Sequence, residues 1–180
     1  MNVLYTTTIV LVALWLVVIT IVVYKKIRKR NDYNTTISFK ETLDLVEVPV
    51  ATFKFKDNND KLFKMSFVID TGASTSFISK DSIDRIGERY KDFFEFKEEI
   101  CSANKSVSGS EAYSVRFFYD NSVFITNFTV MDINSIIDYI KREYGITISG
   151  VIGSEFFNKE SADIDFKYYK LRLNGKRNDS

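Results

Sequence analysis

Short apolar segments separated by polar turns follow one another along most of the chain. Two of them, 45–55 and 62–69, alternate partly between apolar and polar positions and flank the turn-forming residues 57–60, which predicts a β-hairpin. Similar short runs predict further strands at 77–79, 93–100, 113–119, 123–131, 146–152, 164–166 and 168–173. Many short strands with few helices indicate a small β barrel or a β sandwich.

Two segments have helical spacing instead. Apolar residues at 133, 136, 137, 140 and 144 share one helix face, and Gly145 follows where a glycine commonly ends a helix. Residues 81–90 predict a second short helix with Asp81 as its N-cap, and 155–159 predict a helical turn. The polar residues 31–38 predict a linker, and the small polar residues 102–110 predict a loop or hairpin tip.

The longest apolar run, Val3–Tyr24, has a different character, because residues 1–24 carry no charged side chain. At 1.5 Å per residue it spans about 33 Å, enough for the hydrocarbon layer of a bilayer. The alternative of a buried helix in a soluble protein fails because no position in the run carries a charge and the run shows no polar face. A cleaved signal peptide carries its positive charge before the apolar core and small residues after it, whereas bulky Val22, Val23 and Tyr24 stand at this exit. The run therefore predicts an uncleaved transmembrane helix.

The basic residues after the apolar run predict how the helix is oriented in the membrane. Five of the 25 basic residues directly follow the apolar run: Lys25, Lys26, Arg28, Lys29 and Arg30. Positive flanks stay on the cytoplasmic side, so we expect a single-pass membrane protein with a cytoplasmic soluble domain. The rest of the chain is net negative without a clustered basic face, which argues against a nucleic-acid partner. The predicted division is an anchor at 1–24, a basic juxtamembrane segment and linker at 25–43, a folded domain at 44–174 and a tail at 175–180.

Missing residue types exclude several kinds of chemistry. The chain has no histidine, which excludes Ser–His–Asp and Cys–His nucleophiles and histidine-ligated zinc. Its single cysteine, Cys101, excludes an intramolecular disulfide and is expected to be a small packed side chain. We therefore predict neither a metal site nor a cofactor.

The most informative segment is Phe67–Ser74, which reads Phe-Val-Ile-Asp-Thr-Gly-Ala-Ser. An apolar strand delivers Asp70 into a tight turn, and a carboxylate at the end of a buried strand is costly unless it has a partner or a role. Asp-Thr-Gly also occurs in ordinary turns. Here it is followed about eighty residues later by Ser149-Gly150-Val151-Ile152-Gly153, and then by Ala162-Asp163-Ile164-Asp165-Phe166.

This ordered set resembles the retropepsin-like aspartic proteases, the single-lobe relatives of pepsin, over residues 44–174. The resemblance implies a mainly β fold, a closed acid-protease barrel with two short helices. It implies that Asp70 is the catalytic carboxylate and that the active-site loop is shaped by Thr71, Gly72, Ala73 and Ser74. It implies a strand crossing behind that loop at Val151, Ile152 and Gly153, and flap residues at Lys105, Ser106, Val107, Ser108 and Gly109.

The chain departs from the family pattern in three places. Many relatives have aspartate where this chain has Glu155, flaps are often richer in glycine than the single Gly109, and the helix at 133–144 is an insertion relative to the smallest members. These differences concern specificity and the flap more than the catalytic aspartate.

The resemblance also implies a partner. In this family two aspartates share one proton, and one of them activates the water that attacks the peptide. The chain has one Asp-Thr-Gly, because Asp163 and Asp165 lack the following Thr/Ser-Gly and are expected to be surface hairpin residues. The second carboxylate would then be Asp70 of another copy, with Thr71 hydrogen-bonding across the twofold axis of a homodimer. The substrate would be a peptide or protein.

Two other functions fit the same residues. Asp70–Ser74 also fits the phosphate loop Asp-x-Gly-x-Ser of the actin and sugar-kinase superfamily, but that fold needs two such domains around its nucleotide and this chain is too short for them. The serious alternative is a membrane-anchored domain of the same fold that binds or assembles without cutting, since fold does not imply activity.

Overall fold

The structure is a computed structural model that describes residues 15–22, 35–95, 100–102, 105–107 and 111–177. The chain divides into two compact units, Met1–Tyr33 and Asn34–Ser180. Most of the predicted anchor Val3–Tyr24, and the basic residues 25–30, lie outside the described residues.

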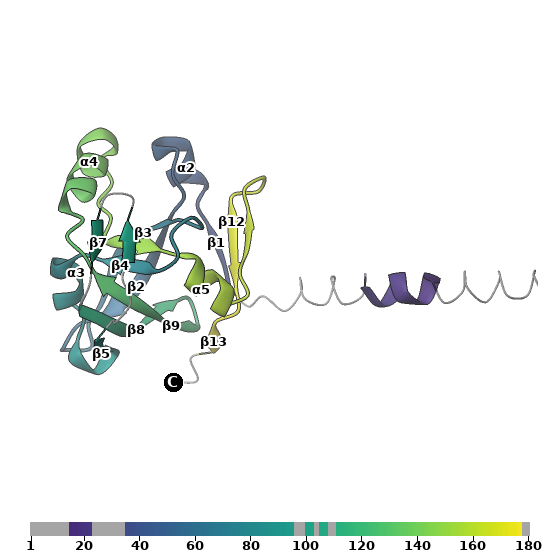
Figure 1. Ribbon diagram of the computed structural model, residues 1–180, viewed down its shortest axis with the longest axis horizontal. Helices are drawn as coiled ribbons and strands as arrows, with labels where there is room; N and C mark the ends of the chain where they lie inside the picture. The colour runs from purple at the N-terminus through teal and green to yellow at the C-terminus, as the bar shows by residue number, and fades with distance from the viewer. Residues whose placement is uncertain (1–14, 23–34, 96–99, 103–104, 108–110, 178–180) are drawn as a thin grey trace, which may run out of the picture. The chain divides into compact units, whose positions relative to one another are not determined.

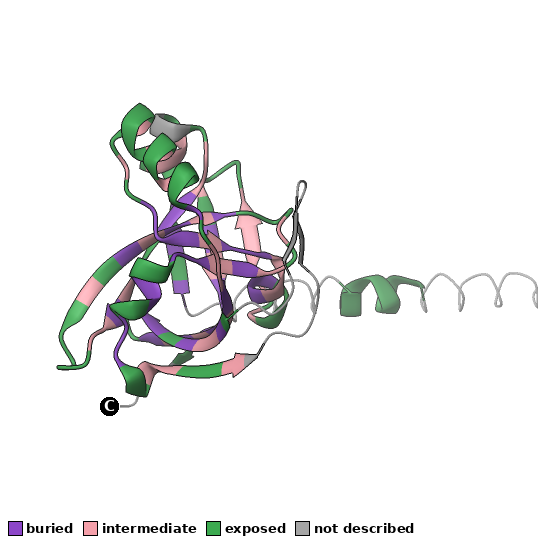
Figure 2. Cartoon of the chain, turned by 60° about the vertical axis from the view of Figure 1, so that its left-hand side comes forward, coloured by how far each residue is buried: buried purple, intermediate pink, exposed green. Residues whose placement is uncertain are grey.

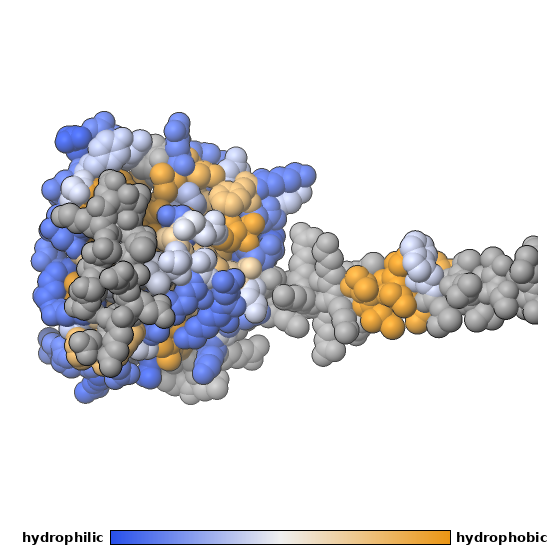
Figure 3. Space-filling view, viewed as in Figure 1, coloured by the Kyte–Doolittle hydropathy of each residue, from blue (hydrophilic) through white to orange (hydrophobic). Residues whose placement is uncertain are grey.

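In the first unit, residues 15–22 are helical with exposed, largely apolar side chains (Figure 3). The only described hydroxyl there, that of Thr20, donates to the Leu16 carbonyl at 2.8 Å, so it bonds within its own helix. Among the described residues, no helix has the length and apolar character needed to cross a membrane.

The second unit is built mainly of strands (Figure 1). The strands are β1 (Thr35–Ser38), β2 (Val50–Lys56), β3 (Leu62–Ile69), β4 (Ser76–Ile78), β5 (Lys91–Glu95), β6 (Ile100–Ser102), β7 (Lys105–Val107), β8 (Glu111–Tyr119), β9 (Ser122–Val130), β10 (Gly150–Ile152), β11 (Asp163–Asp165), β12 (Lys170–Leu173) and β13 (Lys176–Arg177). The helices are α2 (Lys40–Val46), α3 (Lys80–Asp84), α4 (Asn134–Tyr144), α5 (Ser154–Lys159) and a 3-10 turn, η1 (Glu88–Tyr90).

A closed barrel forms the centre of this unit. The largest sheet has the strand order β13-β9-β4-β10-β3-β2-β8-β5, and a further pairing of β9 with β8 closes six of these strands into a ring. The prediction of a mainly β protein with a closed barrel is therefore confirmed. Two smaller sheets, β1-β12-β11 and β6-β7, complete the strands.

Buried and exposed residues alternate along the strands (Figure 2). The buried positions fill the barrel with aromatic rings. In β2, Phe53 and Phe55 point inward, whereas Thr52 is exposed and Lys54, between the two rings, is half-buried. Apart from Phe39, which follows β1, the fully buried rings come from four strands and one helix: Phe53, Phe55, Phe67, Phe117, Phe124, Phe128 and Phe156. Their edge-to-face and tilted contacts, and the area they bury, make this cluster the main source of stability.

A second packing layer lies outside the barrel. The α4 residues Ile137, Ile140 and Tyr144 pack against Val50 and Ile148, and α2 contacts α4 at the same end of the barrel (Figure 1). Gly145 ends α4 with a positive φ of 71°, as its sequence predicts.

Several local predictions are corrected. Residues 35–38, predicted as linker, form β1, whose register pairs Thr35 with Leu173. The segment 40–46 is helical rather than the beginning of a strand from 45, which adds a helix beyond the two expected. The predicted strand 146–152 is confined to β10, and Lys176–Arg177 of the predicted tail pair with β9.

The helix predicted at 81–90 is interrupted after α3 and resumes only as the turn η1. Its N-cap is Ser79 rather than Asp81, because the Ser79 hydroxyl accepts from the Ser82 N–H at 3.3 Å.

Candidate functional site

The turn that carries Asp70 lies at the end of three neighbouring strands. β10 pairs in parallel with β3 and antiparallel with β4, so it is inserted between the two strands that the turn connects. The Asp70 N–H donates to the Ile152 carbonyl at 3.0 Å. Because the sheet continues through this bond, the position of Asp70 is set by the strand that contains Val151 and Ile152, although these segments are far apart in sequence.

Hydrogen bonds orient the carboxyl group itself. The Gly72 N–H donates to Asp70 Oδ1 at 2.8 Å, and the Ala73 N–H donates to the Asp70 carbonyl at 3.3 Å. The side chains of Asp70 and Thr71 are exposed, as is that of Ser74, whereas Ala73 is half-buried. Within the described part of the chain, no basic side chain forms an ion pair with Asp70. One carboxylate oxygen is therefore held by the backbone while the group faces solvent.

The segment after β10 is tied to the same turn. The Ser154 N–H donates to the Ala73 carbonyl at 2.7 Å, and the Glu155 N–H donates to the Ser74 carbonyl at 3.3 Å. The Gly153 N–H donates to the hydroxyl of buried Ser76 at 3.0 Å. Backbone hydrogen bonds from β10 and from the residues after it thus hold the Asp70–Ser74 turn at both of its ends.

Two glycines allow β10 to pass this close. A Cβ at Gly153 would lie 2.4 Å from the Thr75 carbonyl oxygen, and a Cβ at Gly150 would lie 2.0 Å from the Phe77 carbonyl oxygen. Both obstacles are backbone atoms, which cannot move aside as a side-chain end can. The Gly-Val-Ile-Gly run is therefore a packing requirement of the strand beneath the turn.

Gly153→Ala should accordingly destabilise the second unit by about 1–3 kcal/mol, the usual cost of forcing an extra group into a packed site. Urea unfolding, monitored by far-UV circular dichroism, measures the change in the free energy of unfolding. Gly145→Ala is the comparison, because a Cβ there meets nothing within 4 Å and only the positive φ of 71° opposes it. An unchanged midpoint for Gly153→Ala would contradict the close approach.

The remaining predicted residues lie elsewhere or outside the description. The flap candidates Lys105, Ser106 and Val107 form β7, which pairs antiparallel with β6. Ser108 and Gly109 lie outside the described residues. Cys101 is the middle residue of β6.

Asp163 and Asp165 both form ion pairs with one arginine. The Arg172 guanidinium bonds Asp163 Oδ2 at 2.6 Å and Asp165 Oδ2 at 3.3 Å, and only 16% of its side chain is exposed. Burial acts to raise the pKa of the Asp165 carboxyl, but hydrogen bonds from the Tyr168 N–H and from Arg172 outweigh it and lower that pKa. These carboxylates hold β11 to β12.

Within the described ranges, no three His, Cys, Asp or Glu side chains are grouped so that they could hold a metal ion. The one supporting residue that sequence reasoning missed is Ser76, whose hydroxyl anchors Gly153. Its only signal is its place in the run Ser74-Thr75-Ser76 after the Asp-Thr-Gly.

A scan against models of known protein families finds no match for this chain. A search of curated proteins finds no match either.

Proposed function

We propose that this protein is a membrane-anchored aspartic endopeptidase of the retropepsin-like kind, active as a homodimer. The observation that carries the proposal is the Asp70 carboxylate, which is exposed on a turn fastened over β10 and has its Oδ1 held by the Gly72 N–H. A fixed and solvent-facing carboxylate at the end of a buried strand suits a catalytic acid or base better than a structural ion pair.

The proposed chemistry needs two such carboxylates. Two aspartates held close together share one proton, because both cannot ionise at about 3 Å from each other. The ionised member takes a proton from water, and the resulting nucleophile attacks the peptide carbonyl. The protonated member donates to the carbonyl oxygen as its charge develops. The aspartate that took the proton from water then gives it to the amide nitrogen as the C–N bond breaks, and the hydroxyl proton returns to the other aspartate as the carbonyl re-forms.

The second carboxylate is proposed to come from a second copy. The chain contains one Asp-Thr-Gly, and Asp163 and Asp165 are bound by Arg172. A twofold axis beside the turn would bring two Asp70 side chains together, with both copies contributing the same residues. Each chain would then hold half of a site.

The proposed anchor is the apolar run Val3–Tyr24, with the folded unit on the cytoplasmic side because of the basic residues 25–30. Confining chains to a membrane raises their effective concentration, so a weak interface can still assemble. The anchor would then support activity by promoting dimerisation.

The experiment that tests this proposal compares concentrations of residues 34–180, the unit that carries its own aromatic core. A mixed peptide library is incubated with the protein from nanomolar to micromolar concentration, and products are identified by mass spectrometry. We expect the rate per molecule to rise with concentration and to saturate when dimers predominate, because the dimer is the active species.

Sedimentation at the same concentrations separates the outcomes. A constant rate per molecule with a monomer throughout would refute the shared site, whereas a constant rate with a dimer throughout would agree with a tight interface. No cleavage at any concentration, with a dimer present, would favour the alternative of a domain that binds or assembles without cutting.

A further inference from the structure

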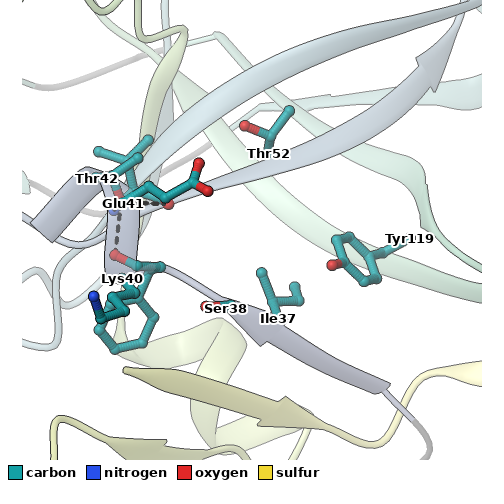
Figure 4. Close-up of a pocket in the computed structure, with 9 residues that line it drawn as sticks. Ile37, Ser38, Lys40, Glu41, Thr42, Thr52 and Tyr119 are labelled. Carbon is teal, nitrogen blue, oxygen red and sulfur yellow. Dashed lines mark hydrogen bonds between the residues drawn. The ribbon is translucent and has the colours of Figure 1, made fainter. Parts of the chain in front are cut away.

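A pocket of about 390 Å³ separates β1 from β2 (Figure 4). Ile37 and Ser38 of β1 line one side, and Val50 and Thr52 of β2 line the other. Figure 4 shows the α2 residues at one end of the pocket and Tyr119, from the end of β8, at the other. Asp70 does not line it.

The side of β1 that faces the pocket is an open strand edge. β1 is the outer strand of the sheet β1-β12-β11, and the Phe39 N–H donates to the Tyr169 carbonyl at 3.0 Å. Antiparallel pairing uses every second residue, so the odd-numbered residues face β12. The backbone N–H and C=O groups of Thr36 and Ser38 consequently point away from β12, and among the described residues no strand pairs with them.

The facing side of β2 is open in the same way. Pro49 accepts from the Ile69 N–H at 2.8 Å, which directs the odd-numbered residues of β2 towards β3. The even-numbered residues face the opposite side, where Lys54 pairs with Phe118 of β8. Beyond Lys54, no described strand continues along this edge, so the N–H and C=O of Thr52 face the pocket.

At Val50, the even-numbered residue before Thr52, a side chain of α2 satisfies the backbone groups of this open edge. The Val50 N–H donates to the Thr42 hydroxyl at 3.2 Å, and that hydroxyl lies 3.1 Å from the Val50 carbonyl oxygen and 3.0 Å from that of Phe39. One side chain of α2 therefore substitutes for a missing neighbouring strand at Val50. Within the described residues, Thr52 has no comparable substitute.

The side chains around the pocket define what could lie between the strands. Ile37 is buried and the Tyr119 ring lies over Phe53 at 6.2 Å, so the barrel side of the pocket is apolar. The outer side carries Thr52 and Glu41, whose carboxylate extends over the pocket in Figure 4. Lys40 is paired with Asp44 at 3.2 Å, and no described basic side chain pairs with Glu41.

We propose that this pocket is a docking site for an extended peptide segment of a partner protein, inserted as a strand between β1 and β2. Backbone groups of Ser38 and Thr52, which line the pocket, would supply hydrogen bonds from both walls, and those of Thr36 would extend the pairing along the same open edge of β1. Such backbone pairing is how an added strand gains affinity. A strand alternates its side chains, so apolar residues would face Ile37 and Tyr119 while basic residues would face Glu41. This site is separate from Asp70 and does not depend on the proposed peptidase activity.

The test uses full-length protein in detergent and a fluorescein-labelled probe peptide, acetyl-Lys-Val-Lys-Val-Lys-amide. We expect a saturable rise in fluorescence anisotropy. We also expect slower hydrogen–deuterium exchange at 35–39 and 50–53 when the unlabelled peptide is bound, because the amides that now face the pocket would gain partners. The same peptide N-methylated at both valines should bind at least roughly threefold more weakly, the effect of losing one or more hydrogen bonds.

Two variants of one residue separate backbone from side-chain effects. Ser38→Pro removes the N–H that faces the pocket, and edge strands tolerate proline at such positions. It should weaken binding by roughly 3- to 10-fold, whereas Ser38→Ala keeps the N–H and should bind as the wild type does. Glu41→Lys should also weaken binding of this basic probe.

The proposal is overturned if the N-methylated peptide binds as well as the unmodified one, whether or not Ser38→Pro folds. Equal binding of acetyl-Glu-Val-Glu-Val-Glu-amide would remove the role given to Glu41. Protection of 35–39 that grows with protein concentration in the absence of peptide would assign the pocket to a second copy of this chain instead.

Discussion

Asp70→Asn should abolish peptide hydrolysis by residues 34–180 while leaving their unfolding transition in place. The asparagine carbonyl oxygen can still accept from the Gly72 N–H, which donates to Asp70 Oδ1 at 2.8 Å, so the turn keeps its shape. The amide cannot take a proton from water, and losing a general base costs roughly 10²- to 10⁴-fold in rate. The substitution therefore separates chemistry from folding.

The measurement is the initial rate on the best substrate found in the peptide library, at a concentration where the wild-type protein is dimeric. Asp81→Asn is the matched control, because Asp81 is an exposed aspartate in the first turn of α3, away from the Asp70 turn. Asp81→Asn should keep the wild-type rate. Turnover by Asp70→Asn at the wild-type rate would remove Asp70 from the mechanism.

Phe117→Ala should cost about 3–5 kcal/mol of the free energy of unfolding, the usual range for truncating a buried phenylalanine. Its ring is fully buried and lies 5.0 Å from that of Phe53, 5.5 Å from Phe55 and 5.7 Å from Phe156. Removing it opens a cavity at the centre of this ring cluster. Many domains have a total stability of about 5–15 kcal/mol, so this variant would be marginal.

Urea unfolding of residues 34–180 gives the change in free energy. Phe93→Ala is the control, since Phe93 is 62% exposed on the outer strand β5 and contacts Tyr113 at 5.5 Å. That change should cost less than about 1 kcal/mol. Equal losses for the two variants would mean that the barrel interior is not the main source of stability.

Local patterns predicted most of the elements that lie next to each other along the chain. β3 covers 62–69 as its alternation indicates, and α4 ends at Gly145 because its apolar face and its glycine act within the same few turns. Both depend on interactions between residues close in sequence, which a pattern records directly.

Errors arose where distant segments decide the outcome. The polar residues Thr35–Ser38 resemble a linker, yet they form β1 because Ile37 can be buried against Leu171, which lies far along the chain. The strand predicted from 45 begins at Val50, because α2 turns the preceding residues into a helix that contacts α4. Neither contact leaves a periodic signal in its own segment.

At the candidate site, the sequence alone determined the chemistry and the residues that are close together along the chain: a single Asp-Thr-Gly per chain, a Gly-Val-Ile-Gly run and the absence of histidine. Only the tertiary structure decided that β10 enters between β3 and β4, that Ile152 receives the Asp70 N–H, and that Arg172 occupies Asp163 and Asp165. It also decided that β1 and β2 leave open edges facing one pocket. A residue's type sets which bonds it can make, but its partners depend on which strands become neighbours, and that follows from packing the whole barrel around its buried rings.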